Sequence, residues 1–248
     1  SYLYYADRIY QINLAIAGIA VGTVSLPVLS EAFKKRNFLK ISHIQSRSIE
    51  LSLLLSIPAS LGLILASEEI VNALFGYGSF TIENIKMTSE ALKYFGYGVP
   101  AFALIKILSN FFFARNNTKT PFYISLFIVL LNITISIFFF DKIGFVIIPI
   151  ATSISTWIGV LLYIYILNEK NYLLLKKYLP KNIFKIIFNT IIMSITLIFG
   201  LDYFKDYFDY SNKYKLLYLI IIVCFVASIY LISCYLSGIL KRKNYKAN

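Results

Sequence analysis

Apolar residues occur along this chain in long runs that short polar segments separate. With a window of about 19 residues, the pattern predicts seven membrane-spanning helices. The run 216–236, for example, contains no charged residue, which is typical of a membrane span. We therefore expect an all-α integral membrane protein. The predicted spans are residues 3–29, 46–75, 91–113, 121–140, 144–167, 183–201 and 216–239.

The second and third predicted spans contain Pro58 and Pro100 in their interiors. A proline has no N–H group and leaves one main-chain oxygen of the preceding turn without a helical partner. We expect a kink at each site, with the freed oxygen bonded by a neighbouring helix.

Composition places the chain outside the soluble class. Of its 248 residues, 58% are apolar and only 15% are charged, and the mean hydropathy is +0.72. Ordinary soluble domains contain about 25% charged residues. The sequence has no Gly-rich phosphate loop and no Gly-x-Ser-x-Gly motif, and a single histidine, His43, cannot build a metal site alone. We expect neither an enzyme nor a bound cofactor.

The positive charges indicate an orientation in the membrane. The chain has 24 Lys and Arg against 12 Asp and Glu, a net charge of +12. The odd-numbered loops and the C-terminal tail contain fifteen of the cations, whereas the even-numbered loops contain six. This bias predicts that the C-terminus is cytoplasmic. The charge then reflects topology and attraction to anionic membrane lipids, so we expect no nucleic-acid partner.

Seven spans with a cytoplasmic C-terminus place residue 1 outside the cell, and that residue is Ser1 rather than Met. An odd number of helices upstream would give the whole protein a cytoplasmic N-terminus. We therefore expect residues 1–248 to be the C-terminal part of a larger transporter.

Three cations, Arg8, Arg47 and Lys106, are not accounted for by the loops or the tail, and a charge inside a span costs about 2.5–3.5 kcal/mol on insertion scales. Arg47 lies one turn from a basic loop, and we expect it to extend its head group to the membrane surface. Lys106 lies among apolar residues, and this position favours the interpretation that it has a buried partner or faces a cavity. Its alternative role is to bond the carbonyl groups that Pro100 leaves free.

Arg8 belongs to a stripe of polar and small residues at helical spacing: Tyr4, Arg8, Gln11, Ala15, Gly18, Gly22 and Ser25. Gly18 and Gly22 form a small-xxx-small pair that lets another helix approach closely. The polar end of the stripe either faces a hydrated cavity or brings Arg8 to the outer membrane surface.

Several strings in the first half of the chain, in this order, resemble the MurJ/MviN family of lipid II flippases, which belongs to the multidrug/oligosaccharidyl-lipid/polysaccharide exporter superfamily. The strings are Tyr4-Tyr5-Ala6-Asp7-Arg8, Leu26-Pro27-Val28-Leu29-Ser30, Leu74-Phe75-Gly76-Tyr77-Gly78-Ser79-Phe80, Lys106-Ile107-Leu108 and Phe113-Ala114-Arg115-Asn116-Asn117-Thr118-Lys119-Thr120-Pro121. The resemblance maps the chain onto helices eight to fourteen of a fourteen-helix, two-lobed transporter, with the N-terminal lobe as its missing partner.

The resemblance implies a transporter that flips lipid II from the cytoplasmic to the outer leaflet of the bacterial inner membrane for cell-wall synthesis. Arg8 matches the cavity arginine of the family, which would bind the pyrophosphate, with Gln11 and Lys106 as further candidates. The family often has an acidic residue at the position of Gln11, so a hydrogen-bonding role is favoured there over an ion pair. Asp7 and Arg115 are candidates for a gate or loop role.

The resemblance also implies alternating access between two lobes. Because no nucleotide-binding motif is present, we expect the membrane potential or an ion gradient to drive transport. The last two helices would border a groove for the lipid tail.

Three other classes compete with this interpretation. The first is an exporter of another polyprenyl-linked oligosaccharide, or of drugs, in the same superfamily. A drug exporter would favour buried carboxylates, and Glu50 is the only plausible one. The second is a seven-helix receptor or retinal protein complete in itself. A retinal protein would need a lysine in its last helix, and 216–239 contains none. A membrane subunit without transport activity is the third.

Overall fold

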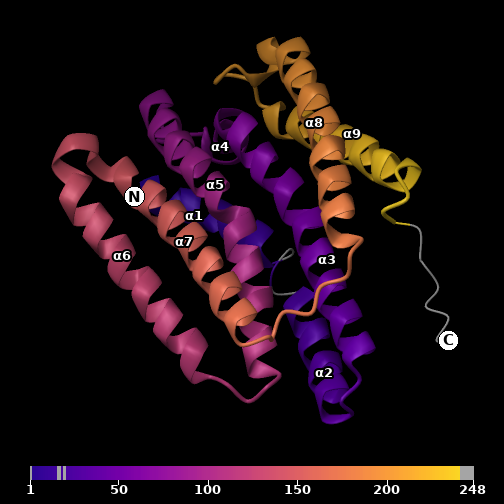
Figure 1. Cartoon of the computed structure of the whole chain (residues 1–248). Coiled ribbons are helices and arrows are strands. Elements are labelled where there is room, and N and C mark those ends of the chain that lie inside the picture. The colour runs from indigo at the N-terminus through magenta and orange to yellow at the C-terminus, as the bar shows by residue number, and fades with distance from the viewer. Residues whose placement is uncertain (1, 16–17, 19–20, 241–248) are drawn as a thin grey trace.

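The computed structural model describes residues 2–15, 18 and 21–240 of the chain. They form long α-helices joined by short turns (Figure 1). The α-helices are α1 (Tyr2–Leu14), α2 (Val21–Lys34), α3 (Phe38–Leu65), α4 (Ser67–Phe75), α5 (Ile82–Phe113), α6 (Lys119–Ile143), α7 (Ile147–Glu169), α8 (Leu179–Tyr203) and α9 (Lys215–Leu236). Short 3-10 helices, η2 (Gly144–Val146) and η3 (Lys205–Phe208), precede α7 and follow α8.

Five helical stretches of the described residues are long and apolar enough to cross a membrane. The expected class, an all-α membrane protein, is therefore confirmed. The count of seven spans stays a prediction, because Lys119–Glu169 is one continuous apolar stretch that contains both α6 and α7. The first predicted span, 3–29, includes α1 and part of α2, and its residues 16–17 and 19–20 lie outside the described residues.

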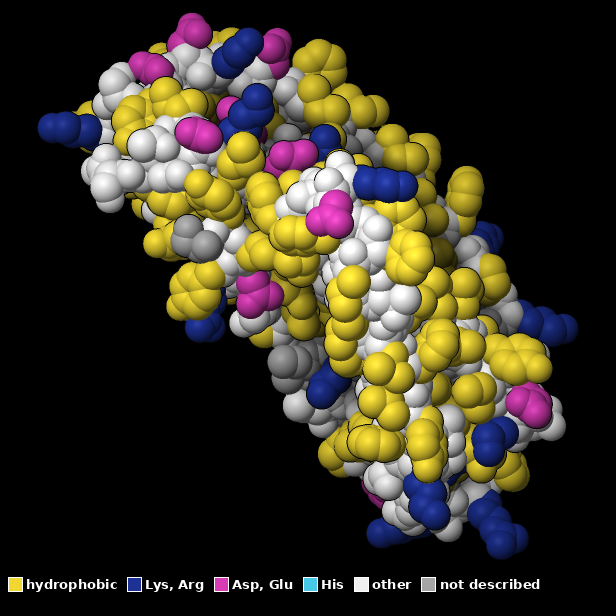
Figure 2. All heavy atoms as spheres, turned by 90° about the vertical axis from the view of Figure 1, so that its left-hand side faces the viewer, with side chains coloured by type: hydrophobic (Ala, Val, Ile, Leu, Met, Phe, Trp, Pro, Cys, Tyr) yellow, Lys and Arg dark blue, Asp and Glu magenta, His cyan; other side chains and the backbone are white. Residues whose placement is uncertain are grey.

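The helices stand in a row in the order α6, α7, α5, α3, α8, α9, and α1 and α2 pack against α5 and α3 (Figure 1). α5 is the most buried of the apolar stretches, whereas α6 has only Pro121 and Ile124 buried. Figure 2 shows the face on the α6 side, where hydrophobic side chains cover the middle and most charged side chains lie toward the two ends. This distribution suits a bundle that lies across a bilayer.

Two helices begin earlier than the hydropathy pattern predicts. α3 begins at Phe38 because the Asn37 side chain accepts a hydrogen bond from the Lys40 N–H at 2.9 Å. α5 begins at Ile82 because the Thr81 hydroxyl oxygen accepts one from the Asn84 N–H at 3.3 Å. Both side chains are N-caps, which mark the start of a helix whether or not the first turns are apolar.

The predicted second span, 46–75, is not one helix. α3 ends at Leu65, and α4 starts after a bend at Ala66 with Glu68 and Glu69 in its first turn. Two acidic residues in this position stabilise a new helix N-terminus through the helix dipole. The last four predicted spans differ from α6, α7, α8 and α9 by at most four residues at either end.

Four helices end in the same way. Beyond the C-termini of α2, α5, α7 and α9, one residue has a positive φ, and the next N–H bonds back to the fifth residue before it. This is the Schellman motif, which satisfies the last carbonyl groups and reverses the chain within a few residues. The positive-φ residues are Arg36, Asn116, Asn171 and Gly238. All four lie on the side that the charge bias assigns to the cytoplasm.

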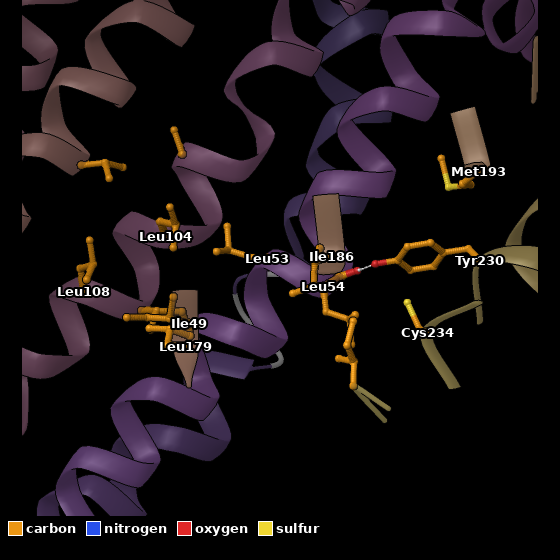
Figure 3. Packing of buried hydrophobic residues seen from close by; sticks show 14 of the residues in the cluster. Ile49, Leu53, Leu54, Leu104, Leu108, Leu179, Ile186, Met193, Tyr230 and Cys234 are labelled. Atoms are coloured by element: carbon orange, nitrogen blue, oxygen red, sulfur yellow. Dashed lines mark hydrogen bonds between the residues drawn. The ribbon is translucent and has the colours of Figure 1, made fainter. Parts of the chain in front are cut away.

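A neighbouring hydroxyl bonds each oxygen that an internal proline frees in α3 and α5, as the sequence predicts. Pro58 frees the oxygen of Leu54, which accepts a hydrogen bond of 2.8 Å from the Tyr230 hydroxyl (Figure 3). Pro100 frees the oxygen of Gly96, which accepts one of 2.7 Å from the Ser60 hydroxyl. The proline site of α3 is thus joined to α9, and that of α5 is joined to α3.

Candidate functional site

The orientation of α1 is set by aromatic packing against α5. Tyr10 is buried, and its ring stacks on Phe95 with centroids 5.0 Å apart and planes within 9° of parallel. Ala6 and Ile9 are buried on the same face. Because one face of α1 is held in this way, the opposite face points outward with its polar side chains.

Arg8 and Gln11 lie on that outward face and are both exposed. The Arg8 guanidinium lies over the Tyr4 ring at 5.0 Å, and within the described residues it forms no ion pair. Gln11 donates a side-chain hydrogen bond to the carboxylate of Asp7. The cation of Arg8 is therefore positioned but unneutralised, and Asp7 is held by a bond within its own helix.

The small end of the predicted stripe packs as expected. Gly18, Gly22 and Ser25 are buried, and a Cβ atom at Gly18 would lie 3.4 Å from the Cα atom of Ala103 in α5. The Asn110 side chain donates a hydrogen bond of 2.9 Å to the oxygen of Gly22. The two glycines therefore let α5 approach closely, as the small-xxx-small pair predicts.

Lys106 has no buried partner in the part of the chain that the structure describes. Its side chain is exposed, and its aliphatic stem lies beside Gly18 and Gly22. The alternative role is also excluded, because Ser60 bonds the oxygen that Pro100 frees. Among the described residues Lys106 has no buried partner because the two glycines leave room for its stem on the bundle surface, and a cavity at Lys106 stays a prediction.

The structure does not bring Lys106 close to Arg8. Tyr10 contacts Phe102 with centroids 5.4 Å apart, and Lys106 lies one turn further along α5, about 6 Å by helical rise. Arg8 precedes Tyr10 on α1, which runs in the same direction. The two cations therefore lie at different depths and cannot hold one phosphate group together within this lobe.

Arg115 is enclosed by its neighbours. Its guanidinium lies between the rings of Phe33 and Tyr172, at 4.0 and 4.1 Å. It donates hydrogen bonds of 2.8 Å to the oxygen of Phe111 and 2.9 Å to that of Tyr172. Burial lowers the pKa of Arg115 to about 10, which leaves it charged at neutral pH. These contacts join the end of α5 to α2 and to the α7–α8 loop.

Arg47 pairs with a carboxylate, a contact that the sequence did not predict. Its guanidinium bonds Glu50, whose carboxylate is almost fully buried and also accepts a hydrogen bond of 3.0 Å from Asn182. Nearby, the buried Gln45 side chain donates to the oxygen of Tyr172 and accepts from the N–H of Leu174. This end of α3 therefore holds the α7–α8 loop in place.

An apolar groove of about 440 Å³ runs between α1, α3, α8 and α9. Ile9, Ile12 and Asn13 of α1 form one wall, and α8 and α9 form the other. Tyr230 and Pro58 both line it, so the hydrogen bond at the α3 kink lies in its wall (Figure 3). The groove opens beside the helix that carries Arg8.

Sequence reasoning missed Lys215, which it assigned to an exposed loop. The residue is fully buried, and its ammonium group donates to Asn72 and to the main-chain oxygens of Gly76 and Tyr210. The Tyr77 ring lies 4.3 Å from the same nitrogen. Lys215 thus joins α9 to the α4–α5 connection. The only sequence signal was its position as the first residue of a long apolar run.

Comparison with known proteins gives consistent matches. Residues 1–220 match the family model described as lipid II flippase MurJ. A probable lipid II flippase MurJ of Rickettsia prowazekii is 40% identical over 166 residues, which is 66% of this chain and 33% of the relative. That of Rhizobium tropici is 39% identical over 157 residues, 63% of this chain and 30% of the relative.

A solved structure is similar over nearly the whole chain. It is described as lipid II flippase MurJ in an inward closed conformation, and it matches with a TM-score of 0.80 and 27% identity. The match covers 96% of this chain and 47% of the solved one. The chain spans about a third of the length of the curated relatives. The family-model match covers most of the chain, which therefore belongs to the MurJ family of lipid II flippases.

Proposed function

We propose that this chain is the C-terminal transmembrane lobe of a flippase that moves lipid II from the cytoplasmic to the outer leaflet of the bacterial inner membrane. Its seven spans would be helices eight to fourteen of a two-lobed protein, with the C-terminus in the cytoplasm. The family match and the length of the relatives support this assignment. The charge bias of the loops supports the orientation.

The observation that carries the proposal is the pair of surfaces that α1 presents. Arg8 and Gln11 are exposed on one side, and Ile9, Ile12 and Asn13 line the apolar groove on another. Lipid II combines an anionic pyrophosphate with a long apolar chain. An unneutralised guanidinium binds a pyrophosphate oxygen through charge-assisted hydrogen bonds, and the groove accommodates the apolar chain.

Transport then follows alternating access, in which the two lobes rock around a midplane cavity. The membrane potential or an ion gradient supplies the energy. Lys106, which is exposed further toward the cytoplasm than Arg8, contacts the phosphate at a different stage from Arg8. Arg115 and Asp7 are held by contacts within the lobe and act as structural groups rather than as mobile gates.

A drug exporter of the same superfamily is less consistent with the site. Such a transporter would favour a buried carboxylate that can bind and release a proton. Glu50 is buried, but Arg47 and Asn182 both bond it. Its charge is therefore already compensated.

The test measures lipid II in the outer leaflet of bacteria depleted of their own flippase and supplied with the protein that contains this chain. We expect surface lipid II to return, and Arg8→Ala to abolish it at an unchanged membrane level of protein. Lys93→Ala, which removes an exposed cation from α5, is the matched control. No restoration with protein present in the membrane would favour another polyprenyl-linked glycan as cargo.

A further inference from the structure

A second cavity, of about 460 Å³, lies between α2 and α3. Its walls are mainly apolar and include Val24 and Val28 of α2 with His43, Arg47, Leu51 and Leu55 of α3. His43 and Arg47 stand at the end nearer the start of α3, and Leu55 lies about 12 Å deeper by helical rise. The cavity is thus apolar along its length and polar at one end.

The polar end presents positive charge outward. The Arg47 side chain is 37% exposed, whereas that of its partner Glu50 is 2% exposed, so the carboxylate lies behind the guanidinium. Glu50 accepts a hydrogen bond from one of the five N–H donors of Arg47. The main-chain N–H of Lys176 bonds the Ser46 hydroxyl oxygen at 2.8 Å, which places a second cationic residue near this end of α3.

The combination selects among possible occupants. A soluble anion would gain nothing from the walls of Val24 and Leu51, and an uncharged lipid would gain nothing from Arg47. A lipid with an anionic phosphate uses both, because its acyl chain packs against the apolar walls and its phosphate accepts the guanidinium donors. The charge bias places this end of α3 at the cytoplasmic surface.

We propose that the α2–α3 cavity binds an anionic phospholipid of the cytoplasmic leaflet, with its phosphate at Arg47 and Lys176 and one acyl chain along Val24 and Leu51. This site rests on the orientation proposed above and is separate from Arg8. Leu55 lines both this cavity and the apolar groove beside α1. The bound lipid therefore borders the groove in which the cargo chain would lie.

The test uses the purified protein in vesicles with a phosphatidylglycerol that carries a photoactivatable group on its acyl chain. Labelled peptides are then mapped by mass spectrometry. We expect labels on α2 and α3 between Val21 and Leu55, at least fivefold stronger than with a phosphatidylcholine that carries the same group. Labelling needs no transport, so it separates a failure of this site from a failure of the proposed flipping.

Variants test the charges and the walls separately. Arg47→Gln combined with Glu50→Gln and Lys176→Gln removes both cations without leaving a buried carboxylate unpaired, and labelling should fall at least fivefold. Lys177→Gln, the exposed neighbouring lysine, should leave it unchanged. Val24→Trp should block labelling by filling the cavity while every cation remains. Equal labelling by the two lipids, or equal loss with Lys177→Gln, would overturn the proposal.

Discussion

The hydroxyl of Tyr230 bonds the main-chain oxygen of Leu54 at 2.8 Å, which is the oxygen that Pro58 leaves unpaired (Figure 3). Both groups are buried, so water does not substitute for either. The Tyr230 hydroxyl in the last helix thus satisfies a main-chain oxygen of α3 that lies 176 residues earlier in the sequence.

Tyr230→Phe tests this bond directly. Removing the hydroxyl leaves the Leu54 oxygen without a partner, and we expect a loss of about 1–3 kcal/mol in the free energy of unfolding. The measurement is a denaturant titration of the protein in detergent. Tyr165→Phe removes an exposed hydroxyl from α7 and should change the free energy by less than about 0.5 kcal/mol. Equal losses in the two variants would contradict the role of the bond.

The crossing of α5 and α7 depends on a glycine. A Cβ atom at Gly98 would lie 2.8 Å from the Ser153 hydroxyl oxygen and 3.3 Å from the Ser153 Cα atom, and a backbone atom cannot move aside easily. Gly98→Ala should therefore destabilise the bundle by about 1–3 kcal/mol. At Gly62 no atom lies within 4 Å, and Gly62→Ala should stabilise α3 by about 0.5–1 kcal/mol. Thermal unfolding of both variants checks the opposite signs.

Arg115→Lys keeps the charge but removes the planar guanidinium. The lysine cannot stack on Phe33 and Tyr172 while bonding two main-chain oxygens, so the α7–α8 loop should loosen. We expect trypsin to cleave after Lys176 or Lys177 several-fold faster than in the unmodified protein. Lys119→Arg, at an exposed neighbouring cation, is the control. Unchanged cleavage in Arg115→Lys would mean that the loop is held by other contacts alone.

Lys215→Met replaces a buried ammonium with an apolar side chain of similar length. Asn72, Gly76 and Tyr210 would each lose a donor, and we expect a loss of about 1–3 kcal/mol in stability. Lys213→Met, two residues earlier and exposed, should cost little. Comparing the midpoints of the two denaturant titrations distinguishes a structural lysine from a surface one.

The orientation is testable by labelling single cysteines in intact cells. In a background with Cys224→Ser and Cys234→Ala, we expect Ser79→Cys to react with a membrane-impermeant maleimide. Lys177→Cys should react only after the membrane is opened. Both positions are exposed in the structure, so failure to react reflects the membrane rather than burial. Reversed accessibility would invert the topology.

The apolar segments were predictable from sequence because hydropathy reports the part of a helix that lies in lipid. The starts of α3 and α5 were not, because the caps Asn37 and Thr81 act through single hydrogen bonds in polar segments. The division at Ala66 was missed for a related reason, since Ser67–Phe75 remains apolar enough to extend the run.

The candidate site likewise has features that the sequence predicts and features that it does not. The exposed side of Arg8 and the packing of Gly18 follow from helical spacing, which the sequence contains. The partners of Arg115 and Lys215 lie far away along the chain, and charge patterning cannot identify them. Charge patterning therefore placed these two cations in loops although both are enclosed by protein.

The hairpin of α8 and α9 is attached to the rest of the bundle at three depths, through Lys215 and Asn72, Tyr230 and Leu54, and Glu50 and Asn182. The walls of the groove beside α1 therefore keep their spacing before anything enters it. Because the protein loses little conformational entropy on binding, almost all of the entropy cost comes from ordering the apolar lipid chain that enters the groove. The affinity for the lipid should then depend on how readily its apolar chain adopts the shape of the groove. The branching and stiffness of that apolar chain should therefore matter more than its length.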